Sequence, residues 1–305
     1  MLSWFRTEKG AEKWLGMQSP SHAGETEKMV VNSSTITKLL RPVYDTPLNL
    51  IAIFGAARQG KSFMMNLLAG SQDLFKISNL REPCTSGVDL SRHFIDLDEF
   101  SALNGGQAKG GDMKIGFVDA EGQGDRDISY DSRLVTPILL ASKVIIFNWK
   151  DSLQTDRILN LLAVLAHAAQ GIEVGQESKM FGHLHIVFRD WNFVNTSPDQ
   201  VYRDIFAKEK GRSNEVTIRN HSRATILDCF ESVTITLFPA PVSDTASLSD
   251  KIRFDQLQTS FQVKLTEFRK VLSEQLQNPT LFNNQPITGR SLDTLMPALA
   301  EVIGY

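Results

Sequence analysis

The chain of 305 residues has a formal net charge of −3, and 42% of its residues are hydrophobic. This is the composition of an ordinary globular protein with one large or two modest domains, and it lacks the basic excess that nucleic-acid binding needs. Two widely separated cysteines without metal-ligand spacing, Cys84 and Cys229, argue against a disulfide scaffold and suit a reducing, cytoplasmic compartment. The longest apolar run, VTPILLASKVIIFNW, is interrupted by Pro137 and Lys143 and falls short of the roughly 18 residues of a membrane span.

Residues 1–45 differ from the rest, and we interpret them as an N-terminal extension and linker. They carry the aromatic residues Trp4, Phe5 and Trp14, followed by the polar stretch SPSHAGETEK. The aromatic residues, with Leu15, either pack back on the following domain or form a face for a membrane surface or a partner.

In residues 46–305, strand and helix patterns alternate. This alternation predicts an α/β fold with a mostly parallel sheet and helices on both faces. Apolar or alternating runs predict strands at 48–54, 87–97, 113–120, 143–149, 183–190 and 232–238. Helical patterns occupy 61–70, 155–171, 197–211 and 214–230, and two appended C-terminal helices are expected near 251–278 and 288–303, the last leading toward a further helical domain.

The stretch GAARQGKSF, residues 55–63, follows the first strand with the spacing of a phosphate-binding loop. Gly55 and Gly60 let backbone N–H groups turn toward phosphate oxygens, Lys61 neutralises the β- and γ-phosphate charge, and Ser62 places a hydroxyl on Mg²⁺. The loop also leads into a helix N-terminus, which favours anions. Strand, loop and helix together predict a P-loop that binds a nucleoside triphosphate with Mg²⁺. The loop by itself identifies neither the base nor whether hydrolysis follows.

Two later segments supply the rest of a metal and phosphate site. MKIGFVDAEG ends a strand with Asp119, which we expect near Mg²⁺, and the N–H of Gly122 is placed to meet the γ-phosphate. Thr85, in REPCTSGVDL, lies just before a strand and completes the metal shell. Taken alone, Asp119 is equally a solvated carboxylate and Thr85 a loop residue without a role. Together with the P-loop, they predict Mg²⁺-linked functions.

The base is harder to assign, because the usual guanine-reading sequence Asn-Lys-x-Asp is absent. NWKD at 148–151 has a scrambled order, and we do not assign it to the base. In HIVFRDWNF, Arg189 and Asp190 end the next strand, at the sheet edge where such folds bind ligands. Asp190 can accept the N1–H and N2–H₂ donors of guanine, and the stem of Arg189 can pack on the purine. An ordinary strand-end Arg–Asp pair is the alternative.

These motifs resemble the large G domain that atlastins and guanylate-binding proteins share within the dynamin superfamily. The stretches that carry the resemblance are GAARQGKSFMMNLLAG, TSGVDLS, VDAEGQGD and, most specifically, VFRDWNF. That family replaces Asn-Lys-x-Asp with Arg-Asp after this strand. The likeness continues through TGRSLDTLMPAL and covers roughly 48–303, and its later stretches favour atlastins.

The resemblance implies that Arg58, inside the P-loop, is an internal arginine finger. It would stabilise the transferring phosphoryl group when two G domains meet across their nucleotides, and a surface arginine is the alternative. Val242, in PAPVSD, is expected in the loop that caps the base. The expected catalytic residues are Arg58, Lys61 and Thr85, and the expected metal ligands are Ser62, Thr85 and Asp119. The expected nucleotide contacts are Gly55, Arg58, Gln59, Gly60, Lys61, Ser62, Phe63, Gly122, Arg189, Asp190 and Val242.

Two positions depart from the family pattern. Pro83 stands where guanylate-binding proteins carry a serine two residues before the switch threonine, and Ala120 stands where threonine is usual. We therefore expect a Mg²⁺-dependent GTPase of uncertain rate that forms a homodimer across GTP or GDP. It would remodel or tether membranes, at the cytosolic face of an internal membrane. A slow or non-hydrolysing GTP-dependent interaction module is one alternative, and a P-loop ATPase or kinase with an Arg189–Asp190 salt bridge is another.

Overall fold

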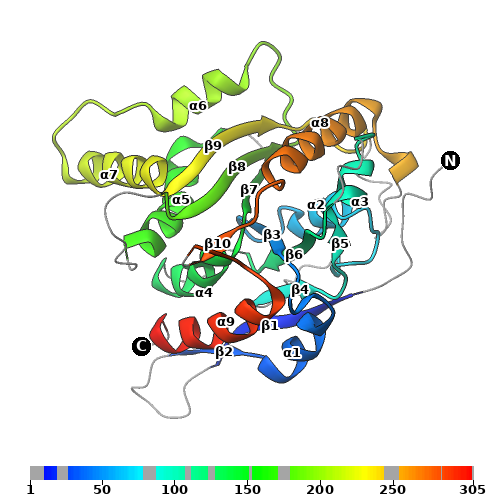
Figure 1. Cartoon of the computed structure of the whole chain (residues 1–305). Coiled ribbons are helices and arrows are strands. Elements are labelled where there is room, and N and C mark those ends of the chain that lie inside the picture. The colour runs from blue at the N-terminus through cyan, green and yellow to red at the C-terminus, as the bar shows by residue number, and fades with distance from the viewer. Residues whose placement is uncertain are drawn as a thin grey trace.

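The computed structural model describes residues 10–18, 27–77, 87–106, 111–122, 128–150, 153–170, 179–243, 254–282 and 284–303. These residues form one nine-stranded sheet, with helices on both of its faces, and a small hairpin (Figure 1). The strands are β1 (Ala11–Gln18), β2 (Lys28–Val31), β3 (Leu48–Phe54), β4 (Val88–Ser91), β5 (Ile95–Asp96), β6 (Lys114–Ala120), β7 (Val144–Lys150), β8 (Phe181–Arg189), β9 (Phe230–Leu237), β10 (Leu281–Phe282) and β11 (Gln285–Pro286). The helices are α1 (Ser33–Leu40), α2 (Lys61–Leu68), α3 (Leu97–Ala102), α4 (Ile128–Ala141), α5 (Thr155–Gln170), α6 (Pro198–Phe206), α7 (Asn214–Cys229), α8 (Thr259–Gln275) and α9 (Gly289–Ile303), with 3-10 turns η1 (Arg41–Val43) and η2 (Phe254–Gln256).

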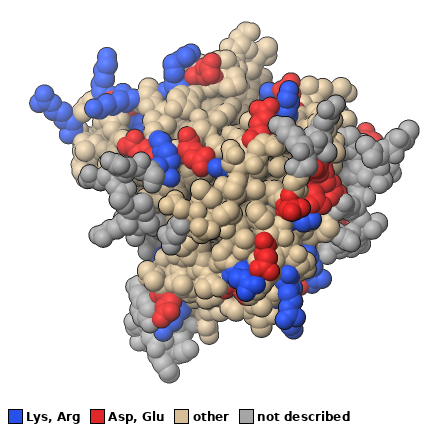
Figure 2. Space-filling view, in the orientation of Figure 1, with Lys and Arg blue, Asp and Glu red and all other residues tan. Residues whose placement is uncertain are grey.

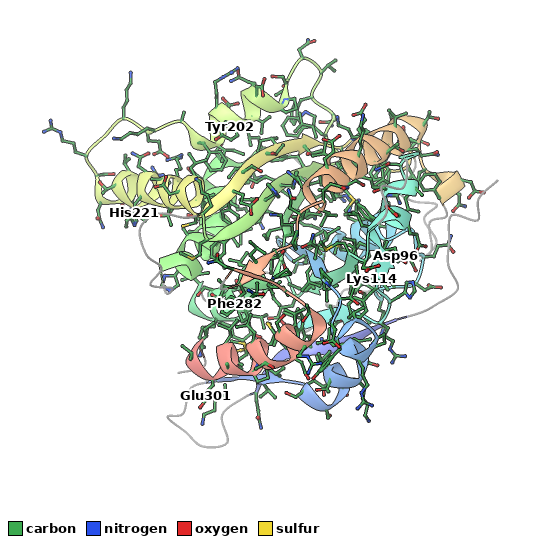
Figure 3. The ribbon with its side chains drawn as sticks, in the orientation of Figure 1. Asp96, Lys114, Tyr202, His221, Phe282 and Glu301 are labelled. Carbon is green, nitrogen blue, oxygen red and sulfur yellow. The ribbon has the colours of Figure 1, made fainter. Side chains whose placement is uncertain are left out.

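The sheet has the order β2-β1-β4-β6-β3-β7-β8-β9, with β5 paired to β6. From β6 to β9 all neighbours are parallel, whereas the β1–β2, β1–β4, β4–β6 and β5–β6 pairs are antiparallel. On the short β5–β6 pair, Lys114 Nζ lies 2.7 Å from Asp96 Oδ1 (Figure 3). The expected α/β fold with a mostly parallel sheet is confirmed.

The central strand β3 is buried on both faces, which explains its unbroken apolar run LNLIAIF. Its side chains alternate between two cores. Leu50, Ala52 and Phe54 lie in the core beneath α4, α5 and α9, and Ile51 and Ile53 lie in the core beneath α2, α3 and α8 (Figure 1). Because the strand is held from both sides, the loop at its carboxyl end starts from a fixed position.

The segment expected to be an extension and linker contributes two strands to this sheet. β1 pairs with β4 through a bulge between Lys13 and Leu15, and β2 pairs with β1. Trp14 and Leu15 are fully buried in the main core, so these two side chains pack on the domain. The strands before residue 45 and those after it therefore belong to the same sheet. Trp4 and Phe5 lie outside the described residues.

The C-terminal helices are joined to the start of β3 by a buried amide. Asn49 Nδ2 donates to the carbonyl oxygens of Leu276 (2.9 Å) and Asn278 (3.1 Å), and its Oδ1 accepts from Thr280 N (2.8 Å) and Thr280 Oγ1 (3.0 Å). Asn49 is fully buried, and these hydrogen bonds satisfy both polar atoms of its side chain within the protein. The amide fixes the end of α8 against the strand that leads to the P-loop.

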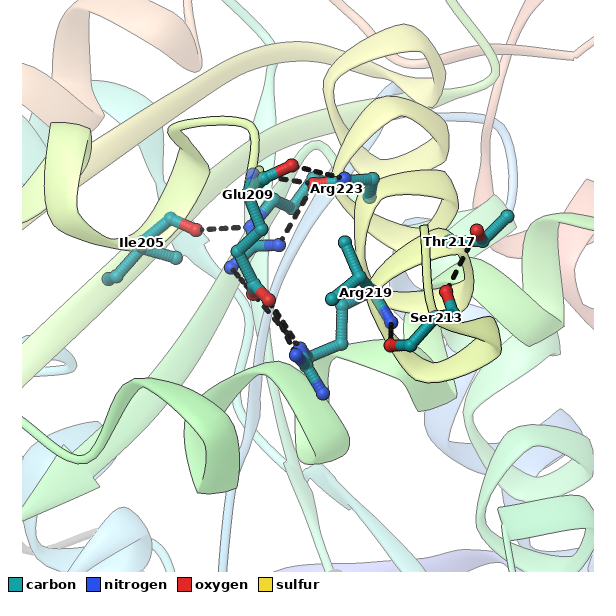
Figure 4. Close-up of polar contacts among 8 residues, drawn as sticks. Ile205, Glu209, Ser213, Thr217, Arg219 and Arg223 are labelled. Atoms are coloured by element: carbon teal, nitrogen blue, oxygen red, sulfur yellow. Dashed lines mark hydrogen bonds and ion pairs between the residues drawn. The ribbon is translucent and has the colours of Figure 1, made fainter. Parts of the chain in front are cut away.

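Helix α6 begins at the expected cap, where Ser197 Oγ accepts a hydrogen bond from Gln200 N. It ends at Phe206, earlier than the sequence pattern predicts. The reason is the acidic residue just beyond it. Glu209 accepts hydrogen bonds from both Arg219 and Arg223 of α7 (Figure 4). These two guanidinium groups lower the pKa of Glu209 to about 2. The ion pairs fix the connection between α6 and α7 as a loop.

The surface charge in this view does not single out one binding face. Basic and acidic side chains are intermixed over the face shown in Figure 2. Within the described residues, none of the helices combines the length and hydropathy that crossing a bilayer requires.

Candidate functional site

The P-loop connects β3 to α2 at the carboxyl edge of the sheet. The chain leaves β3 toward β6 on one side and later returns to β7 on the other, which is the switch point where α/β sheets bind ligands. Gly55 has φ +133°, and a Cβ there would lie 2.1 Å from the carbonyl oxygen of Asn148. Gly60 has φ +72°. Both positions exclude a side chain, so the loop follows its neighbours closely.

Two side chains at the start of α2 face the interior of the loop. Lys61 is 7% exposed, and its Nζ donates to the carbonyl oxygen of Ala56 over 3.1 Å. Ser62 Oγ donates to Asp119 Oδ2 over 2.5 Å. Asp119 is almost completely buried at the end of β6, where β3 and β6 pair Ile53 with Asp119. A hydroxyl and a carboxylate side by side are the hard oxygen ligands that Mg²⁺ takes, so these residues fit the ion.

The segment after β6 lies directly on the P-loop. A Cβ on Gly122 would lie 2.2 Å from Ala57 Cα, so the two backbones touch there. One residue earlier, Glu121 accepts from Gly87 N (2.5 Å), and Glu121 N donates to Gly87 O (2.7 Å). Gly87 follows the stretch that contains Thr85. Thr85 and Pro83 lie outside the described residues, so their expected roles stay predictions.

Arg189 contacts the P-loop. Its guanidinium Nη1 donates to the carbonyl oxygens of Gly60 (2.8 Å) and Gln59 (3.3 Å), and its Cζ lies 5.3 Å from the centre of the Phe63 ring. Arg189 is 5% exposed, and burial lowers its pKa, against the opposing effect of the Asp190 carboxylate. The guanidinium thus holds the turn that begins α2. Packing of its stem on a purine stays a prediction.

The next residue, Asp190, has a left-handed backbone with φ 57°. Its Oδ2 lies 3.4 Å from Lys150 Nζ. Its Oδ1 is buried and has no hydrogen-bond partner within the described part of the chain. A buried acceptor without a donor is costly, and the N1–H and N2–H₂ groups of guanine are donors of the right kind. The carboxylate therefore fits a guanine base.

The structure also brings in two residues that the sequence analysis set aside. Asn148 is fully buried, and its Nδ2 donates to Gln59 O over 2.8 Å. The backbone N–H of Lys150 donates to Gln59 Oε1 over 3.1 Å. Both come from NWKD, whose order does not match a guanine-reading motif. The positions of these residues at the end of a predicted strand could have indicated their place in the site, because the carboxyl ends of neighbouring parallel strands meet at one edge of the sheet. The β7–β8 pairing places Lys150 opposite Arg189.

Arg58 and Val242 are the two remaining expected site residues that the structure describes. Arg58, within the P-loop, is exposed and has φ 62°, a backbone region that residues other than glycine rarely adopt. Val242 is 8% exposed and follows β9. An arginine finger at Arg58 and a base contact at Val242 stay predictions.

These features are typical of a nucleotide-binding domain of the P-loop GTPase type. They are the loop between β3 and α2, the Ser62–Asp119 pair at the start of α2, and Asp190 at the end of β8. The family model described as "Guanylate-binding protein, N-terminal domain" matches residues 26–280, and the chain belongs to this family. Membership implies a large GTPase domain that binds a guanine nucleotide.

Two curated relatives agree with this assignment. The chain is 24% identical over 306 residues to guanylate-binding protein 7 of Mus musculus, an alignment that covers 92% of this chain and 45% of that protein. It is 22% identical over 301 residues to guanylate-binding protein 4 of Homo sapiens, again with 92% and 45% coverage. The chain thus spans less than half the length of these relatives. The expected greater likeness to atlastins stays a prediction.

Proposed function

We propose that this domain binds GTP with Mg²⁺ and hydrolyses it to GDP and phosphate. One observation carries the proposal: the P-loop, the Ser62–Asp119 pair and Asp190 lie along one edge of the sheet. Asn148 and Arg189, at the ends of β7 and β8, donate hydrogen bonds to the P-loop carbonyl oxygens of Gln59 and Gly60. Such an edge can hold the phosphates at one end and the base at the other.

The roles follow from the contacts. Lys61 exchanges its bond to Ala56 O for the β- and γ-phosphate oxygens, where its charge is needed. Ser62 and Asp119 would hold Mg²⁺, which when bound would neutralise charge on the phosphates. Gly122, in contact with Ala57, offers its N–H beside the γ-phosphate. Thr85 completes the metal shell in this proposal, on the strength of the resemblance.

Hydrolysis is proposed to depend on a second copy of the chain. Arg58 is exposed and has a left-handed backbone, so a second copy of the chain can reach its side chain. A facing G domain would exclude water there and strengthen the interaction of Arg58 with the transferring phosphoryl group. Membrane tethering or remodelling driven by this homodimer is supported by the resemblance to atlastins alone.

A second candidate is a GTP-dependent dimerisation module that hydrolyses slowly or not at all. It is favoured by Ala120, a buried residue beside Asp119 with no hydroxyl to offer, and by Pro83, which has neither hydroxyl nor N–H. Under this reading the nucleotide drives assembly and GTP persists in the complex.

Phosphate release separates these possibilities. It is measured with GTP and with ATP, with Mg²⁺ or with a chelator, over a hundredfold range of protein concentration. GTP-only, Mg²⁺-dependent release with a specific activity that rises with concentration supports the dimeric GTPase. GTP binding without release at any concentration supports the module. Equal release from ATP contradicts guanine reading by Asp190.

A further inference from the structure

Asp190 forms its ion pair with Lys150 and not with its sequence neighbour Arg189. Arg189 directs its guanidinium to the carbonyl oxygens of Gly60 and Gln59. The salt bridge of Asp190 is with Lys150 of the neighbouring strand, where Lys150 Nζ lies 3.4 Å from Asp190 Oδ2. The Lys150 side chain is 41% exposed and the Asp190 side chain is 21% exposed, so the pair is partly open to solvent.

This ion pair leaves the carboxylate free to accept a base. A carboxylate has about four lone-pair directions, so Oδ2 can accept from Lys150 and from one further donor. Oδ1 has no donor within the described residues. The left-handed backbone of Asp190 is an uncommon conformation outside glycine, and such strain is found where a side chain must be aimed.

We propose that Lys150 is a specificity-determining residue of the base site: its ammonium group holds the Asp190 carboxylate in the orientation that accepts the N1–H and N2–H₂ donors of guanine. The inference rests on the proposed function, since it assigns a further residue to the same site. Lys150 acts through Asp190 and is a positioning residue. Its backbone N–H, which holds Gln59 Oε1, is a separate contact that a side-chain substitution leaves in place.

The test compares two substitutions at the lysine. Lys150→Met keeps the stem and removes the charge, and Lys150→Glu puts a like charge beside Asp190. Fluorescent GDP and ADP analogues are titrated against each full-chain variant with Mg²⁺. We expect GDP affinity to fall about two- to fivefold in Lys150→Met, the size of a partly exposed ion pair, and further in Lys150→Glu. ADP affinity should not change, because adenine has no N1–H or N2–H₂ to offer.

Two controls separate this role from a structural one. Lys264→Met replaces a lysine of comparable exposure, which is paired with Glu267 on α8, and should leave both affinities unchanged. In an Asp190→Ala background, Lys150→Met should have no further effect on GDP, because its target is gone.

The outcomes distinguish the inference from the function beneath it. The proposal is supported if Lys150→Met lowers the GDP-over-ADP preference of the unsubstituted chain and causes no further fall when it is added to Asp190→Ala. If Asp190→Ala erases the preference while Lys150→Met leaves it intact, the inference is wrong and the proposed function stands. If the unsubstituted chain shows no preference, both are overturned.

Discussion

The guanidinium of Arg189 is hydrogen-bonded to the carbonyl oxygen of Gly60 over 2.8 Å, with its plane beside Phe63. Gly60 is the residue before helix α2, and its left-handed turn brings it so close that a Cβ would lie 2.3 Å from Arg189 Nη1. The two residues of the predicted base motif, Arg189 and Asp190, therefore have different roles. Arg189 braces the phosphate loop, and Asp190 is the proposed acceptor of the base.

This division predicts different losses at the two positions. Arg189→Lys leaves one point charge where a planar group met two carbonyl oxygens, so the loop loses part of its support. We expect affinity for GDP and ADP to fall together, by about tenfold, the loss of one charge-assisted hydrogen bond. Asp190→Ala should weaken GDP alone. Titration of both nucleotides against both variants measures this, and a loss confined to GDP in Arg189→Lys would contradict the bracing role.

The contact between Ser62 and Asp119 predicts a metal-linked defect. Ser62→Ala removes a proposed Mg²⁺ ligand, the hydroxyl that lies 2.5 Å from Asp119 Oδ2, and leaves the carboxylate in place. We expect the Mg²⁺ concentration for half-maximal GTP hydrolysis to rise at least about tenfold. The free energy of unfolding should fall by about 1–3 kcal/mol, because the buried Asp119 carboxylate loses a hydrogen-bond donor. The measurement is phosphate release against Mg²⁺ concentration. An unaltered Mg²⁺ midpoint would remove Ser62 from the metal site.

Much of the central fold could be predicted from sequence, because its signals are local. A parallel strand covered on both faces must be apolar throughout, and LNLIAIF and KVIIFNW meet that condition. The P-loop follows from spacing alone, since glycines, lysine and serine each have a separate physical reason to stand where they do.

The rest depended on contacts between distant residues. Trp14 and Leu15 are consecutive, yet both lie in the same core, because a bulge breaks the alternation by which strands are recognised. Asn148 and Lys150 belong to the site through the register of β7 with β3 and β8, not through a motif order. The hairpin β10–β11 is exposed and only two residues long on each side, so its sequence carries almost no pattern.

Asn49 should be a costly position for the fold. Asn49→Ala removes hydrogen bonds to Leu276, Asn278 and Thr280 in a fully buried setting, so carbonyl and amide groups there lose their partner. We expect the free energy of unfolding to fall by about 2–4 kcal/mol. Chemical denaturation followed by circular dichroism measures it, with Lys264→Met as a surface control within about 0.5 kcal/mol of the unsubstituted chain. A loss as small as that of the control would show that the amide does not hold α8 to β3.

A buried histidine predicts how stability depends on pH. His185 on β8 is fully buried, its Nε2 lies 2.7 Å from Gln275 Oε1, and its ring meets Phe268 edge-on. Burial lowers its pKa to about 4 from an ordinary value of 6.5. The folded protein therefore keeps the ring neutral between these values, while the unfolded chain takes up a proton.

The sign follows from that difference. The contribution of the neutral ring to stability is complete above about pH 6.5 and is lost progressively as the pH falls toward 4, by about 3 kcal/mol in total for a shift of this size. His185→Asn removes the titrating group, so its unfolding free energy should decline less steeply between pH 6.5 and 4 than that of the unsubstituted chain. Denaturation series at several pH values provide the comparison. Parallel declines in the two proteins would mean that other groups carry the acid sensitivity and that His185 does not titrate in this range.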